Sequence, residues 1–258
     1  MMKIEFYKYH GTGNDFVIVD NRNSSIQLNE AQVNAICSRR FGVGADGLML
    51  LEKADGFDFK MVYFNSDGKT SSMCGNGGRC LVQFAHDIGE IKNKAHFIAI
   101  DGEHEAELKD GWVHLKMNKT TLPVEKDKGF FLDSGSPHHV LSVANAKDAE
   151  VFTEGRRLRT EVYGAEGANI NFVEKLNDSS VFVRTYERGV EDETYSCGTG
   201  VTASAIIAYQ NKWVDTPEIN ISTLGGELKV SFEQTANGFE NVWLKGPAVQ
   251  VFKGFIEI

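Results

Sequence analysis

Two Cys-Gly-x-Gly segments, at 74–77 and 197–200, hold the residues best suited to chemistry in this chain of 258 residues. Glycines let the backbone approach a ligand closely, and the first N–H groups of a helix lack internal partners and carry partial positive charge. A helix that begins just after such a cysteine would bind an anion and would lower the pKa of the thiol below its usual value of about 8.5. Cys74 and Cys197 are therefore candidates for thiolate chemistry.

The other two cysteines, Cys37 and Cys80, are expected to be buried apolar residues, which is the commonest role of a free cysteine. Cys37 falls on the apolar face of an expected helix, and Cys80 falls inside the helix that follows Cys74. Four cysteines are too few for a disulfide scaffold in a chain of this length. We expect four thiols in a reducing compartment, the cytoplasm.

The composition argues against nucleic-acid and membrane partners. Lys and Arg total 27 against 36 Asp and Glu, which gives a net charge of −9, whereas a nucleic-acid binder is expected to be basic. No apolar run approaches the roughly 20 residues that cross a bilayer. The first 16 residues also lack the apolar stretch and cleavage site of a signal peptide.

Three local patterns could be mistaken for cofactor or metal sites. Gly42, Gly44 and Gly47 match G-x-G-x-x-G, but an expected helix precedes them and a strand follows, the reverse of a dinucleotide-binding turn. His104-Glu105 lacks the second histidine of a zinc-protease helix, and no C-x-x-C pair exists. The Cys74 segment is one residue short of the phosphatase loop C-x5-R. We expect neither a cofactor nor a metal.

The elements that must position the two cysteines are mostly short strands. In the first half, a helix is expected from the N-cap Asn29, with Gln32 completing a capping box, to near Arg40. The strands expected there, from apolar alternation and Gly or Asp-Gly turns, are Lys3–Tyr9, Asp15–Asp20, Gly47–Glu52, Phe57–Asn65, Ala95–Ala99, Glu103–Lys109 and Trp112–Met117.

The second half repeats this organisation. Its expected strands are Gly129–Asp133, His139–Val143, Ala168–Lys175, Ser180–Tyr186, Glu218–Ser222, Glu227–Glu233 and Asn241–Lys245. In each half a strand precedes the Cys-Gly-x-Gly segment and an apolar helix follows it, at a spacing of 123 residues between Cys74 and Cys197. A period this long predicts two similar domains rather than a solenoid.

Six segments, taken together in their order and spacing, resemble the diaminopimelate epimerases over nearly the whole chain. They are HGTGNDF (10–16), FNSDG (64–68), MCGNGGRC (73–80), GANINF (167–172), TYERG (185–189) and SCGTG (196–200). The resemblance implies an α/β (α+β) fold of two pseudo-symmetric domains, each a mostly antiparallel sheet or barrel wrapped around a central helix. The active site would lie in the interdomain cleft. The implied domains are 1–117, completed by a C-terminal strand at 249–258, and 118–248.

The resemblance also implies a mechanism without pyridoxal phosphate or metal. Cys74 and Cys197 would flank the substrate α-carbon, one as the thiolate that removes the α-proton and the other as the thiol that returns a proton to the opposite face. Arg188 would hold the distal carboxylate of the substrate through a bidentate fork. The implied substrate-binding residues are Asn14, Asn65, Gly75, Asn76, Asn169, Glu187, Arg188, Gly198 and Thr199.

Glu187 and His138 match positions near a catalytic thiol, where each could bias which cysteine is ionised. Ser136 stands where relatives often have Asn, and Gly47 stands where some have Gln. Ser136 has a shorter side chain than Asn, and Gly47 has none. The sequence therefore leaves substrate contacts at both positions open. Without the resemblance, the asparagines would be assigned to turns and Arg188 to a surface ion pair.

The function implied is an isomerase that interconverts LL- and meso-2,6-diaminopimelate in lysine and cell-wall precursor synthesis. The alternatives are a proline racemase-like enzyme, which also pairs two cysteines, and a non-catalytic amino-acid-binding protein of the same fold. A phenazine-pathway isomerase fits less well, because both helix-start cysteines are retained. The implied partner is a small-molecule substrate, and a homodimer is one alternative left open.

Overall fold

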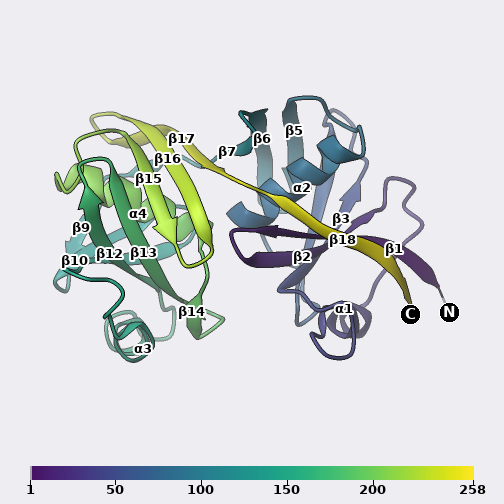
Figure 1. The fold of residues 1–258 in the computed structure, drawn as a ribbon, viewed down its shortest axis with the longest axis horizontal. Coiled ribbons are helices and arrows are strands. Elements are labelled where there is room, and N and C mark those ends of the chain that lie inside the picture. Colours follow the sequence, from purple (N-terminus) through teal and green to yellow (C-terminus); the bar gives the residue numbers. More distant parts are fainter. Residues whose placement is uncertain (1) are drawn as a thin grey trace. The chain divides into compact units, whose positions relative to one another are not determined.

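The computed structural model describes residues 2–258 and divides them into two compact units. Unit 1 comprises Met1–Leu115 and Pro247–Ile258, and unit 2 comprises Lys116–Gly246. Each junction lies two residues before the expected one. Figure 1 shows that both units are built mainly of strands, with one helix in the middle of each, α2 and α4.

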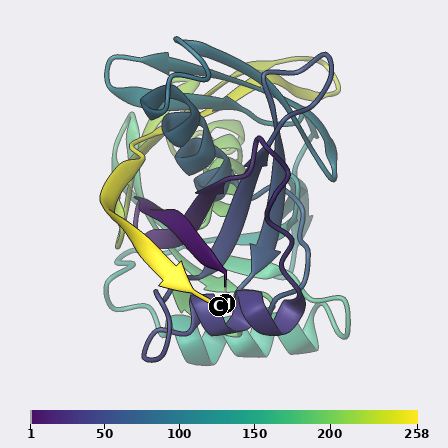
Figure 2. The same ribbon diagram turned by 90° about the vertical axis from the view of Figure 1, so that its right-hand side faces the viewer.

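Unit 1 holds eight strands and two helices. Its elements, in chain order, are β1 (Lys3–Gly11), β2 (Asn14–Asp20), α1 (Glu30–Cys37), β3 (Gly47–Glu52), β4 (Phe59–Asn65), α2 (Gly75–Asp87), β5 (Lys94–Ala99), β6 (Gly102–Lys109), β7 (Trp112–Lys116) and β18 (Val249–Glu257). The C-terminal β18 pairs antiparallel with the N-terminal β1, and Met2 and Ile258 exchange backbone hydrogen bonds of 2.8 and 3.1 Å. Figure 2 shows the two chain ends side by side.

Unit 2 holds ten strands and two helices. Its elements are β8 (Thr120–Thr121), β9 (Val124–Lys126), β10 (Gly129–Asp133), β11 (Pro137–Ser142), α3 (Val151–Glu161), β12 (Asn169–Asn177), β13 (Ser180–Glu187), β14 (Asp192–Thr194), α4 (Gly198–Gln210), β15 (Glu218–Thr223), β16 (Gly226–Gln234) and β17 (Gly238–Gly246). All the strands predicted for this half are present.

The two units pair their strands in the same order, which confirms the predicted repeat. In unit 1, β1/β2 is antiparallel, β2/β3 parallel, β3/β4 antiparallel, β4/β5 parallel, and the β5/β6 and β6/β7 pairs antiparallel. Unit 2 repeats that series from β10 through β11, β12, β13, β15 and β16 to β17. The helices follow the same rule: α2 links β4 to β5, and α4 links β13 to β15.

The central helices lie in the cores of their units. Ten residues of each are buried, and α2 packs on β1, β2, β3, β6 and β18 of its own unit. Helix α4 is small or apolar almost all round, and a helix with no polar face is stable only inside a core. The strands supply that core through alternation, as in β15, where Ile219 and Ile221 are fully buried between exposed neighbours.

Two helices differ from the sequence prediction. The capping box of Asn29 and Gln32 is present, but α1 ends at Cys37 rather than near Arg40, because Ser38 adopts extended backbone with ψ of 120°. Helix α3 was not predicted, since only Val151, Gly155 and Leu158 of its eleven residues are buried and the rest is largely charged. Strand ends otherwise differ from the prediction by at most two residues, except that β17 begins at Gly238, three residues before the predicted Asn241.

Candidate functional site

Both candidate cysteines are N-cap residues, as predicted. Cys74 precedes α2 and Cys197 precedes α4, each with extended backbone at φ of −102° and −119°. Neither thiol accepts a hydrogen bond from the amides of its own helix. An N-cap Ser or Asp would satisfy one of those amides itself. A cysteine there leaves the positive helix end to a bound anion.

In unit 1, the Cys74 thiol is half-buried and contacts Asn14. The Sγ of Cys74 donates to Asn14 Oδ1 at 3.7 Å, and Asn76 Nδ2 donates to the same oxygen at 3.3 Å. The side-chain nitrogen Nδ2 of Asn14 donates to Asp46 Oδ2 at 2.7 Å, and Asp46 is ion-paired with Arg39 at 2.6 Å. Asp46 therefore fixes the amide of Asn14 with its oxygen toward the thiol.

Behind Asn76 lies Arg79, a residue the sequence analysis did not select. Its side chain is 0% exposed, and its guanidinium donates to Asn76 Oδ1 at 3.0 Å and to Gly75 O at 3.2 Å. Burial lowers the pKa of Arg79 to about 10, so the group remains charged near neutral pH. Asn76 is itself 1% exposed, which makes it part of the helix start rather than an open side chain.

Asn65 lies at the end of β4, where its backbone forms the turn at 65–69. Its side chain is exposed and has no hydrogen-bond partner among the described residues 2–258, which leaves it available to a ligand. Its register partner in β3 is Gly47. A Cβ at Gly47 would lie 2.6 Å from the ring of Tyr63, so no side chain fits there without moving that ring.

In unit 2, a chain of hydrogen bonds leads from the protein core to Cys197. The Cys197 sulfur lies 3.5 Å from Thr199 Oγ1, which lies 2.8 Å from His138 Nε2. On the other side of the imidazole, Asn171 Nδ2 donates to His138 Nδ1 at 3.1 Å. Because Nδ1 accepts, the proton of a neutral His138 is on Nε2 and is donated to Thr199.

His138 stays neutral over the physiological range. It is 0% exposed, and burial together with the positive charge of Arg188 lowers its pKa to about 3, against a smaller rise from the hydrogen bond with Asn171. The side chain of Asn171 is oriented by Thr185, whose hydroxyl donates to Asn171 Oδ1 at 3.0 Å. The predicted influence of His138 on a thiol stays a prediction, and the contacts that could transmit it run through the hydroxyl of Thr199.

Asn169, the first residue of β12, holds the turn after β13 that carries Arg188. The backbone N–H of Arg188 donates to Asn169 Oδ1 at 2.8 Å, while Asn169 Nδ2 donates to Ser136 Oγ at 3.2 Å and to Pro137 O at 3.3 Å. Asn169 is 4% exposed, so its polar atoms orient the turn that carries Arg188. Ser136, the departure from the family pattern, is part of that network.

The guanidinium of Arg188 is only partly engaged. Nη1 donates to Glu166 O at 2.9 Å, and Nε and Nη2 have no partner within residues 2–258. These two nitrogens form one edge of the fork and could bind a carboxylate at two points. Arg188 also lines a cavity of about 600 Å³ with Pro137 and Gly167.

Glu187, the residue before Arg188, accepts a hydrogen bond at its carboxylate oxygen Oε2 from Thr194 Oγ1 at 2.9 Å.

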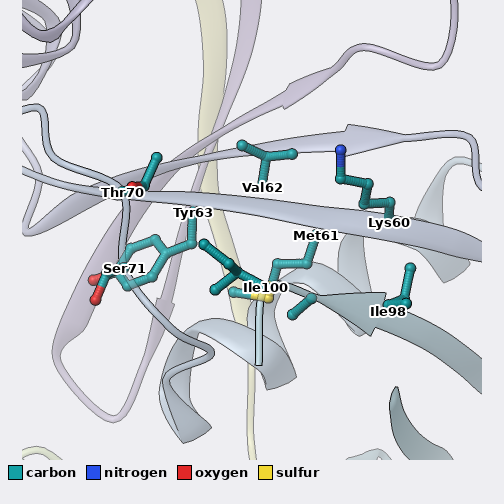
Figure 3. A pocket seen from close by; sticks show the side chains of 9 residues that line it. Lys60, Met61, Val62, Tyr63, Thr70, Ser71, Ile98 and Ile100 are labelled. Atoms are coloured by element: carbon teal, nitrogen blue, oxygen red, sulfur yellow. The ribbon is translucent and has the colours of Figure 1, made fainter. Parts of the chain in front are cut away.

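A second cavity, of about 310 Å³, lies between β4 and β5 of unit 1 (Figure 3). Its walls are mostly apolar, with Met61, Tyr63 and Ile100 directed toward it. None of the predicted site residues lines it. This cavity is therefore not a candidate for amino-acid chemistry.

The remaining negative predictions concern thiols, metals and membranes. Cys37 is 3% and Cys80 0% exposed, and burial raises the pKa of Cys37 to about 11 and that of Cys80 further. Residues 2–258 contain no group of three His, Cys, Asp or Glu that could hold a metal ion. Within the same residues, no helix is long and apolar enough to span a membrane.

Solved structures match the chain over nearly its whole length. A phenazine biosynthesis protein of the PhzF family from Bacillus anthracis superimposes with a TM-score of 0.79 at 16% identity, covering 100% of both chains. A hydroxyproline epimerase from Agrobacterium vitis superimposes with a TM-score of 0.70 at 13% identity, covering 98% of this chain and 92% of the other. These matches show that the chain shares the fold of both proteins.

Sequence comparison identifies the family. The profile of the diaminopimelate epimerase family matches residues 6–122 and 130–251. The diaminopimelate epimerase of Flavobacterium psychrophilum is 49% identical over 97% of this chain and 99% of its own length. That of Aquifex aeolicus is 38% identical over 97% of each chain. The chain belongs to the diaminopimelate epimerase family and is an isomerase, as the sequence motifs predicted.

Proposed function

We propose that this protein interconverts LL- and meso-2,6-diaminopimelate through Cys74 and Cys197, one on each face of the substrate α-carbon. The observation that carries the proposal is the equivalent placement of the two thiols. Each is the N-cap of the central helix in one of two units with the same strand order. A reaction that inverts one carbon needs one acid–base group per face, and a repeated domain supplies two.

The α-proton of an amino acid is weakly acidic because the adjacent carboxylate is already negative. In the proposed reaction, the thiolate takes this proton and becomes a thiol, while the opposite thiol gives its proton to the other face and becomes a thiolate. The number of protons on the protein is unchanged. Amides at the starts of α2 and α4 would stabilise the charge that develops on the carboxylate, each preorganised donor being worth about 3–4 kcal/mol.

Recognition of the distal end is assigned to Arg188 and Asn65. The unpartnered edge of the Arg188 guanidinium suits a carboxylate, and Asn65 presents a side chain without a protein partner in residues 2–258. Asn14 and Asn76 would act at the α-carbon end, where they surround Cys74. Because the mechanism needs both cysteines reduced, one as a thiolate and one as a thiol, a reducing compartment such as the cytoplasm suits it.

Proton exchange tests the proposal. In deuterated water, the protein should place deuterium at the α-carbon of LL-diaminopimelate and form the meso isomer, whereas a binding protein would do neither. Cys74→Ala and Cys197→Ala should each abolish epimerisation. Cys37→Ala and Cys80→Ala are matched controls, because both thiols are buried away from helix starts, and they should cost only stability. Near-normal turnover in either of the first two variants would refute the two-base mechanism.

A further inference from the structure

Arg79 is an unusual residue for the core of unit 1. It is 0% exposed, and its guanidinium contacts only neutral oxygens, those of Gly75, Asn76 and Thr12 at 3.2, 3.0 and 3.4 Å. Its Nε has no partner in the described residues, and none of their carboxylates is ion-paired with it. Burying a cation without a counter-charge is costly, so stability alone does not account for this residue.

The surroundings are shaped to admit the guanidinium. A Cβ at Gly11 would lie 3.1 Å from Arg79 Nη2, so the glycine of the first motif leaves space for this group. The next residue, Thr12, accepts from the same nitrogen. The HGTGNDF and MCGNGGRC segments therefore meet at Arg79, directly behind the helix start that carries Cys74.

The missing counter-charge can come from only one of the nearby thiols. Cys80 is fully buried, and burial raises its pKa, so it remains a neutral thiol. Cys74 is half-buried at the N-terminal end of α2, and Arg79 donates to the carbonyl of the next residue, Gly75, at 3.2 Å. We propose that Arg79 stabilises the thiolate of Cys74 and so makes Cys74 the ionised member of the cysteine pair in the free enzyme.

The other helix offers an internal comparison. Arg79 is the fifth residue of α2 and donates to the carbonyl of the first, Gly75. The fifth residue of α4 is Thr202, which donates to the carbonyl of its first residue, Gly198, at 2.9 Å. The same backbone carbonyl is bound in both helices, but only α2 places a charge there. The proposed asymmetry between the thiols follows from this difference.

Other charged groups around the start of α2 have polar partners. The Asp46 carboxylate, which reaches Cys74 through Asn14, is bound by Arg39. Asp101 accepts from the amide of Met73 at 3.2 Å and contacts His104 at 3.4 Å. On β1 and β2, Lys8 is paired with Asp15 at 2.7 Å. Arg79, by contrast, is a cation that no carboxylate of residues 2–258 pairs with, and it donates to the first carbonyl of α2.

The test measures alkylation of each cysteine by iodoacetamide as a function of pH, with peptide mass spectrometry separating Cys74 from Cys197 in one sample. In Arg79→Met, we expect Cys74 to react about tenfold more slowly at pH 7, with the midpoint of its pH profile about one unit higher. Arg79→Lys should retain most of the wild-type rate because it keeps the charge. Thr202→Val is the matched control and should leave Cys197 within about twofold of wild type.

Thermal unfolding separates the proposed role from a purely structural one. If Arg79 does not serve stability, its removal relieves a desolvation cost, and Arg79→Met and Arg79→Gln should melt at or above the wild-type temperature. A structural role predicts that both variants are destabilised. Unchanged Cys74 alkylation in a folded Arg79→Met protein would overturn the proposal, and so would failure of both uncharged variants to fold. The inference rests on the proposed role of Cys74, but alkylation needs no diaminopimelate. Its outcome is therefore independent of the epimerisation assay.

Discussion

Gly200 is the third residue of α4, where replacement by alanine should act against ordinary helix propensity. A Cβ at this position would lie 2.5 Å from Asn171 Oδ1, 3.2 Å from Cys197 Cβ and 3.3 Å from His138 Cε1. The first distance is too short for any real contact, so Asn171 would have to move. Asn171 is 0% exposed and is held by bonds to Thr185, His138 and the carbonyl of His139.

The size of the effect can be worked out from these contacts. Gly→Ala in a helix normally stabilises a protein by up to about 1 kcal/mol. Overpacking a core site costs about 1–3 kcal/mol, and each neutral hydrogen bond lost costs about 1 kcal/mol. We therefore expect Gly200→Ala to lower the free energy of unfolding by about 1–4 kcal/mol. A domain of this size loses about 2–4 °C in Tm per kcal/mol.

Gly77 is the matched control, because it is the third residue of α2. A Cβ there would lie 3.4 Å from Met49 Sδ and from the Phe16 ring, which are ordinary contacts. Gly77→Ala should leave the Tm unchanged or raise it slightly. The assay is thermal or urea unfolding of both variants, together with alkylation of Cys197. This prediction would be refuted if Gly200→Ala were as stable as Gly77→Ala and Cys197 reacted with iodoacetamide at the normal rate. That result would mean that the alanine Cβ does not disturb Asn171 or the hydrogen-bond chain through His138.

Three further predictions concern recognition, pH and oxidation. Arg188→Lys should lower kcat/KM at least about tenfold, because the planar fork is lost, and an unchanged value would assign Arg188 to structure. His138, whose pKa falls to about 3 on folding, binds a proton only in the unfolded state between that value and about 6.5. Stability should therefore fall as pH drops through this window, by up to about 1.4 kcal/mol per unit, and His138→Gln should reduce that slope when compared from pH 6.5 to 4.5. Air oxidation should inactivate the enzyme by joining Cys74 to Cys197 in a disulfide. Thiol reductants should restore the activity, and bound substrate should slow the inactivation. A disulfide mapped to Cys37 or Cys80 would contradict the proposed pairing.

The sequence alone predicted the features that depend on local chemistry. The capping box at Asn29 and the starts of α2 and α4 after Cys74 and Cys197 follow from residues within one turn of the helix. The strands follow from alternation between Gly-rich turns. Helix α3 was missed because it contributes only three buried residues to the core, which is too few for a clear 3.6-residue period.

The partners of the site residues could not be predicted, because they depend on strand register. His138 meets Asn171 since β11 and β12 pair in parallel with His138 opposite Asn169, and Asn171, two residues on, faces the same side. Nothing within either strand specifies that register. The alternation of Asn169 and Asn171 was nevertheless a usable signal, as two polar residues on one face of an apolar strand indicate a buried polar network. Arg79 gave none, since an arginine in a helix is usually exposed.

The two half-sites share a scaffold but differ in their electrostatics, and the proposed chemistry requires that difference. A two-base epimerase needs one thiolate and one thiol at the same time. Two identical thiols would gain or lose protons together, whereas unequal surroundings separate their ionisation. Arg79 binds the first carbonyl of α2 directly behind Cys74, whereas Cys197 is linked through Thr199 to the neutral His138, and the cation that acts on that imidazole is Arg188. Duplication of the fold would thus supply the two faces, and divergence at the fifth residue of each central helix would supply the opposite protonation states.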